Sequence, residues 1–192
     1  VDGKQVQKAV KVFSKLKARG HKVKYVITNA HANAEREKSA IKDLQVLFNS
    51  YGLSSSEVIF TSLEESPKYE SGVSREIVSQ LFQLSNLFVF PTISENCSLV
   101  LLEAMLSKNL LVLNANVPQL REFGGDNALY MEFGGKDQRV NYDNEDKYYE
   151  DWAAIIENKM KQQTALLGQR DLLRNYNLNH IFKHSIEPLY YE

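Results

Sequence analysis

Two carboxylates flank a short apolar segment in which they could act on one ligand. Glu95 follows an apolar run that ends at Pro91, and Glu103 lies within residues 99–106, whose other side chains are all apolar. A helix that is apolar on every side is normally buried, and an ionised carboxylate there is costly unless it is paired or hydrogen-bonded. Glu103 therefore needs partners. These are either a core arginine or backbone donors, or the adjacent hydroxyls of a ribose, which its two oxygens suit.

The start of the expected helix lies between the two carboxylates. Asn96 and Cys97 precede it, and Ser98 can cap it through its hydroxyl group. The unpaired N–H groups and the dipole at a helix N-terminus favour an anion. A loop carboxylate, a helix N-terminus and a second carboxylate could hold a sugar, a diphosphate and a ribose in that order.

The elements that position this segment follow from apolar patterning. Leu87–Phe90 and Leu110–Leu113 are continuously apolar, as expected of parallel strands that are covered on both faces. Further strands are expected at Val23–Ile27, Val58–Phe60 and around Leu129–Met131, with helices between them. This alternation predicts an α/β fold: a Rossmann-like, doubly wound parallel sheet with helices on both faces and additional C-terminal helices. Ligands of such sheets bind beyond the carboxyl ends of the strands.

The chain is expected to have a core at residues 1–135 and an appendage at 136–192 that packs on the same domain. Residues 136–150 are polar and acidic, and the run Tyr142–Asp151 is interpreted as a solvated linker rather than a metal site. From Trp152 the pattern predicts helix, broken near Asn175 and at Pro188. Because the chain opens on Val1 and enters a helical pattern at once, the first strand is expected to precede it.

Composition narrows the class of protein. The 192 residues are 43% hydrophobic, which supports a real core, and the net charge of −1 favours neither nucleic acid nor an anionic membrane. A single cysteine excludes an intramolecular disulfide. No apolar run approaches the ~18 residues of a membrane span, and no signal peptide is visible. A cytoplasmic location is expected.

The stretch from Pro91 to Glu122 resembles the donor-binding signature of glycosyltransferase family 4, retaining enzymes with the two-domain GT-B fold. Glu95 and Glu103, separated by seven residues, match the hallmark pair of that family in register. Pro91-Thr92, Glu103-Ala104-Met105, the strand Leu110–Leu113 and the segment Asn116–Glu122 match as well. The resemblance extends more loosely from about Lys4 to Phe133 and covers the C-terminal helices only in character.

The resemblance implies a role for each matching position. Glu103 would bind the ribose hydroxyls, and Glu95 would contact hydroxyls of the transferred sugar. Lys4 falls close to a lysine that neutralises the diphosphate, so Glu95 and Lys4 are the catalytic candidates, and the family's arginine would lie upstream. Asn96, Cys97 and Ser98 stand where the family has small or aromatic residues and glycine, and Gln5 stands where glycine often follows the lysine. The remaining donor-binding candidates are Asn96, Cys97, Ser98, Leu99 and Val100 for the diphosphate and sugar, and, from their position alone, Thr61, Val73 and Arg75 for the base.

The resemblance also implies which partners take part. The nucleotide diphosphate sugar would be a substrate, with no cofactor and no metal expected. A glycan, lipid or other acceptor would bind a missing N-terminal domain, which could also hold the protein at a membrane surface. The chain alone is expected to bind nucleotide weakly and to transfer nothing.

Two other classes of protein are alternatives to a glycosyltransferase. A non-catalytic domain that keeps the half-fold to bind a nucleotide or a protein remains open because of Asn96 and Cys97. A dinucleotide-dependent oxidoreductase is disfavoured, since no G-x-G-x-x-G follows a strand. His31 is left out of the site, Cys97 is expected to pack, and His180 and His184 are expected on a surface helix face.

Overall fold

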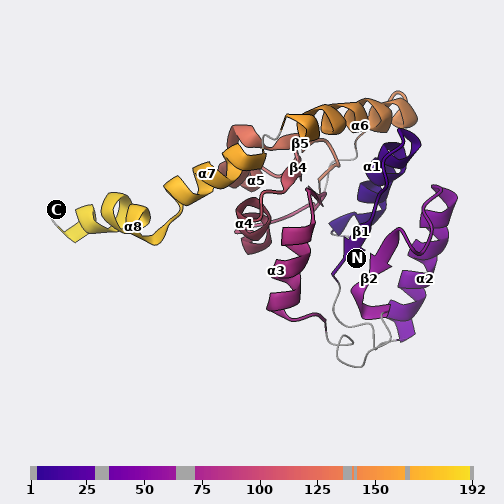
Figure 1. The fold of residues 1–192 in the computed structure, drawn as a ribbon, viewed down its shortest axis with the longest axis horizontal. Coiled ribbons are helices and arrows are strands. Elements are labelled where there is room, and N and C mark those ends of the chain that lie inside the picture. The colour runs from indigo at the N-terminus through magenta and orange to yellow at the C-terminus, as the bar shows by residue number, and fades with distance from the viewer. Residues whose placement is uncertain are drawn as a thin grey trace. The chain divides into compact units, whose positions relative to one another are not determined.

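The computed structural model describes residues 4–28, 35–63, 72–135, 140, 142–162 and 165–190 (Figure 1). His31 lies outside the described residues. The chain divides into two compact units, which are described separately. Unit 1 comprises residues 1–81 and 140–157, and unit 2 comprises residues 82–139 and 158–192.

Unit 1 contains a two-stranded parallel sheet. Strand β1 (Tyr25–Ile27) pairs with β2 (Val58–Phe60), and α2 (Glu35–Ser50) connects them. Helix α1 (Val6–Ala18) lies beside α2, and η2 (Thr61–Leu63) follows β2. Aromatic rings join the helices to the strands: Phe13 stacks on Tyr25 at 4.5 Å between centroids, and Phe48 stacks on Phe60 at 5.9 Å.

Helix α6 (Glu145–Lys161) begins earlier than the sequence predicts. The expected solvated linker over Tyr142–Asp151 is therefore wrong from Glu145 onward. Acidic residues at the start of a helix stabilise its dipole, and here they also pair with a basic stripe on α1. The ion pairs are Lys11–Glu145 at 2.6 Å, Lys15–Asp146, and Arg19 with Glu150 and Glu157, both at 2.8 Å.

Unit 2 contains a three-stranded parallel sheet in the order β3 (Leu87–Phe90), β4 (Leu110–Asn114), β5 (Leu129–Met131). Parallel neighbours need a crossover, which α4 (Leu99–Leu106) supplies between β3 and β4. Helix α5 (Gln119–Gly124) and η4 (Gly125–Asn127) supply the next one. Side chains of β4 are all buried. Leu111 and Leu113 share a core with Leu101, Ala104 and Leu120 of the helices.

The C-terminal helices follow in unit 2. Helix α7 (Ala165–Asn175) packs on α4 and η4, and α8 (Leu178–Ile181), η5 (Phe182–Ile186) and η6 (Glu187–Tyr190) come after it. Helix α7 ends at the predicted break near Asn175, whereas Pro188 lies inside η6 rather than at a break. His184 is exposed and its ring lies 4.3 Å from that of His180, as expected of a surface helix face.

The α/β prediction is confirmed, with parallel strands alternating with helices. Val58–Phe60, Leu87–Phe90 and Leu129–Met131 are strands as predicted, β1 begins at Tyr25 rather than Val23, and β4 extends to Asn114. The paired strands form two small sheets. Among the described helices, none has the length and apolar character needed to cross a membrane.

Gly124 closes α5 against the sheet where no larger residue fits. The Tyr130 hydroxyl donates to the carbonyl oxygen of Gly125 at 2.8 Å, and the Arg121 guanidinium lies 4.3 Å from the Tyr130 ring centroid. Burial raises the pKa of Tyr130 to about 12. A Cβ on Gly124 would lie 2.6 Å from the Tyr130 hydroxyl oxygen and 2.7 Å from Leu113 Cδ1.

Gly124→Ala should therefore lower the free energy of unfolding by about 1–3 kcal/mol, since overpacking forces neighbours to move. Urea unfolding measures this change. Gly168→Ala is the matched control: a Cβ there meets only Asn127 Cβ at 3.5 Å, and alanine in a helix gains up to ~1 kcal/mol over glycine. Equal stability of the Gly124→Ala variant and the unmodified chain would contradict this account of the packing.

Candidate functional site

The carboxyl edge of the unit 2 sheet is held together by one buried amide. Asn114, the last residue of β4, is 0% exposed. Its Nδ2 donates to the carbonyl oxygen of Thr92 at 2.8 Å and to that of Gly134 at 2.7 Å. Its Oδ1 accepts from the N–H groups of Asn116 at 3.1 Å and Phe133 at 3.2 Å. Both hydrogens and both lone pairs of the amide are thus used.

Further side-chain bonds fix the same loops. Asn116 Oδ1 accepts from the Gly134 N–H at 3.0 Å, and the Thr92 hydroxyl donates to the carbonyl oxygen of Ser94 at 2.9 Å. The segments that follow β3, β4 and β5 are therefore tied to one another. Because these loops are already held in place, the residues after Thr92 would not have to become ordered when a ligand binds.

Helix α4 starts at this edge, and Ser98 is its N-cap residue. Its carbonyl oxygen accepts from the N–H groups of Leu101 and Leu102, but its hydroxyl makes no cap hydrogen bond, so that part of the prediction is wrong. Ser98 is only 4% exposed, and within the described part of the chain its Oγ has no hydrogen-bond partner. Burying a hydroxyl in this way costs about 1–3 kcal/mol.

The composition of α4 predicted a helix that is buried on every side. Instead, the helix is partly exposed, and Glu103 within it is half-buried. Leu101, Ala104 and Met105 are buried, whereas Leu99 is 62% and Leu106 is 45% exposed. Helix α4 packs on β4, α5 and α7, and these neighbours leave part of its surface open. The premise that Glu103 must be buried is therefore wrong.

The loop between Thr92 and α4 carries the other carboxylate. Glu95 is half-buried, and Asn96 and Cys97 are exposed. The prediction that Cys97 packs is wrong, because this loop turns its short side chains outward before the helix begins. Val100, at the second position of α4, is half-buried.

The remaining candidates belong to unit 1. Lys4 is exposed, and so is Arg75, the first residue of α3 (Arg75–Leu84). Val73 is half-buried, and Thr61 is buried, with its hydroxyl 3.5 Å from the carbonyl oxygen of Ile27. The structure thus brings Glu95, Glu103 and residues 96–100 together within unit 2, whereas Lys4, Thr61, Val73 and Arg75 are described within unit 1.

Sequence reasoning did not single out Asn114 as a functional residue. The sequence feature that could have identified Asn114 is its position, because its amide side chain directly follows the four apolar strand residues Leu110–Leu113. No group of three or more His, Cys, Asp or Glu side chains that could hold a metal occurs among the residues described. No protein-family model matches the chain, and no curated protein matches it.

Asn114→Ala should lower the free energy of unfolding by about 2–3 kcal/mol, because it leaves several buried backbone groups without partners. Hydrogen exchange should also accelerate at the amides of Asn116 and Phe133. Asn109→Ala is the matched control, since Asn109 is equally buried and donates to the carbonyl oxygens of Phe82 and Ala104 instead. It should destabilise the chain without selective exchange at those two amides. If both variants changed exchange at Asn116 and Phe133 alike, Asn114 would not be what ties the loops.

Proposed function

We propose that unit 2 binds the diphosphate of a nucleotide sugar at the start of α4, as part of the donor-binding domain of a retaining glycosyltransferase. The buried Ser98 hydroxyl carries the proposal. It lies at a helix N-terminus, beside N–H groups for which the helix itself has no acceptors. An anionic oxygen placed there would accept from the hydroxyl and from these N–H groups at once.

The surroundings of Ser98 support this choice of ligand. The segment lies beyond the carboxyl ends of parallel strands, where α/β folds bind ligands. Glu95 precedes the helix start and Glu103 follows it within α4, each half-buried. Glu103 would accept from the ribose hydroxyls, and Glu95 from hydroxyls of the sugar. This assignment rests on the resemblance of the segment Pro91–Glu122 to glycosyltransferase family 4, and the Rossmann-like half of a GT-B fold belongs to the same proposal.

The proposed reaction needs stabilisation of a leaving group. The bond between the sugar C1 and the diphosphate oxygen breaks, and a bond from C1 to the acceptor oxygen forms on the same face. The acceptor proton passes to the departing diphosphate. Amides at the start of α4 would stabilise the negative charge that develops. A glycan, lipid or other acceptor would bind a separate N-terminal domain, so this chain alone would bind nucleotide weakly without turnover.

Ser98→Ala should separate stability from binding. Because the hydroxyl has no partner to lose, the variant should unfold at the same urea concentration or be more stable by up to ~1 kcal/mol. Its affinity for UDP or GDP, measured by calorimetry, should fall about five- to tenfold. Ser107→Ala, at the other end of α4, is the control and should leave affinity unchanged. Unaltered nucleotide affinity in Ser98→Ala would reject the diphosphate site.

Glu103→Ala should abolish recognition of the ribose. The unmodified chain should bind the preferred nucleotide about tenfold more tightly than its 2′-deoxy form, since one hydrogen bond to a charged group is lost. In the Glu103→Ala variant, which has no acceptor at this position, the two forms should bind equally. Glu122→Ala, which removes an exposed carboxylate of α5, should retain the discrimination. Discrimination that persists in Glu103→Ala would place the ribose elsewhere. If the unmodified chain bound neither UDP nor GDP, the proposed function would be rejected.

A further inference from the structure

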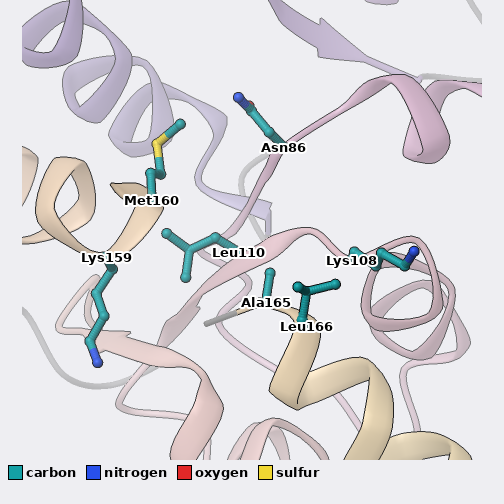
Figure 2. Close-up of a pocket in the computed structure, with 7 residues that line it drawn as sticks. All are labelled: Asn86, Lys108, Leu110, Lys159, Met160, Ala165 and Leu166. Atoms are coloured by element: carbon teal, nitrogen blue, oxygen red, sulfur yellow. The ribbon is translucent and has the colours of Figure 1, made fainter. Parts of the chain in front are cut away.

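A cavity lies at the amino-terminal ends of the unit 2 strands. The cavity has a volume of about 350 Å³ and is lined by Asn86, directly before β3, and Leu110, the first residue of β4. The end of α6 and the start of α7 complete it with Met160 and Leu166 (Figure 2). Asn114 lies four positions after Leu110 along β4, so roughly 13 Å lies between this cavity and the carboxyl edge.

The lining combines apolar side chains with cations. Figure 2 shows Leu110, Met160 and Leu166 around the cavity, with Lys108 and Lys159 on opposite sides and their ammonium groups directed away from these apolar side chains, toward the rim. Among the residues that the structure describes, no carboxylate lines the cavity. Within the described ranges, neither lysine forms an ion pair. Small-molecule pockets are lined mainly by apolar side chains, and the volume of this cavity falls within their typical range of ~300–1,000 Å³.

Lys108 occupies a backbone position that ordinarily belongs to glycine. Its φ is 63°, in the left-handed region. The N–H of Asn109 donates to the carbonyl oxygen of Ala104 at 3.1 Å, and the N–H of Lys108 donates to that of Met105 at 3.0 Å. These two bonds form a Schellman motif, in which glycine is favoured. A side chain is disfavoured in this conformation because its Cβ lies too close to the following carbonyl oxygen, and attraction of the lysine charge to the helix dipole offsets only part of that cost.

Residues with unfavourable backbone conformations cluster at ligand-binding sites, so Lys108 at the rim of this cavity is a candidate for binding a ligand. We propose that this cavity binds a small amphipathic anion, with a carboxylate or phosphate head group at Lys108 and an aliphatic body against Leu110, Met160 and Leu166. This site is independent of the nucleotide site, because its residues lie at the opposite edge of the sheet.

Methionine methyl groups provide a direct test. The chain has three methionines, of which Met105 and Met131 are buried elsewhere and Met160 lines the cavity. Octanoate and octyl phosphate, titrated against the ¹³C-methyl-methionine-labelled 192-residue chain, should shift the Met160 signal to saturation. Octanol should bind about tenfold more weakly, since it lacks the charge, and inorganic phosphate should not shift Met160. Equal affinity for octanol and octanoate, or no shift at Met160, would overturn the proposal.

Lys108→Gly tests the head-group contact without endangering the fold. Glycine relieves the left-handed backbone, so the variant should be at least as resistant to urea as the unmodified chain. Its affinity for octanoate should fall about tenfold. Lys22→Gln, which removes an exposed lysine of unit 1, should leave that affinity unchanged, as should Ser98→Ala. Octanoate binding of undiminished affinity in Lys108→Gly would remove Lys108 from the site and overturn the proposal.

Discussion

The amide of Asn114 is the interaction on which the carboxyl edge of unit 2 depends. Three loops leave the sheet there, and each presents backbone groups that a strand no longer pairs. One buried side chain satisfies four of them, two through Nδ2 and two through Oδ1. Because an amide bonds only over short distances and in defined directions, the loops cannot move independently. The position of Ser98 relative to β4 follows from this constraint, since Thr92 anchors the segment that leads into α4.

Helix α4 then relates the two ends of the sheet. Helix α4 is eight residues long and connects the carboxyl end of β3 to the amino end of β4. Its N-terminus therefore follows the carboxyl edge of the sheet, and its C-terminus precedes the amino edge. The first end carries positive partial charge, which favours an anion, whereas the second carries negative partial charge, to which the Lys108 cation is attracted. The two ends differ in what surrounds them. Hydrogen-bonded loops adjoin Ser98, whereas apolar side chains adjoin Lys108. The first suits a polar, multiply charged ligand, and the second an anion with an apolar body.

Sequence patterning predicted the strands because a buried parallel strand requires a continuous apolar run, and Leu87–Phe90 and Leu110–Leu113 meet that requirement. It also placed the start of α4 at Ser98. It did not predict the start of α6, although a local signal was present: Asn144 Oδ1 accepts from the N–H of Lys147 at 3.0 Å, as a helix-capping residue does, and Glu145 and Asp146 follow it. Nor could composition show that α4 is partly exposed, because a helix's coverage depends on its neighbours. The bonds of Asn114 were equally hidden, since they require the positions of three loops.

Two features at the ends of α4 lower the stability of the folded chain, and a ligand at each end would explain them. A buried hydroxyl without a partner costs about 1–3 kcal/mol, and a lysine in the left-handed region costs about 1–2 kcal/mol. Native proteins are stable by only about 5–15 kcal/mol, so these two costs are a considerable share. Each could be removed by one substitution, to alanine at Ser98 or glycine at Lys108, without altering the core. Packing alone gives no reason for either residue. A ligand that accepts a hydrogen bond from Ser98, and another that pairs with Lys108, would offset both costs in the bound state.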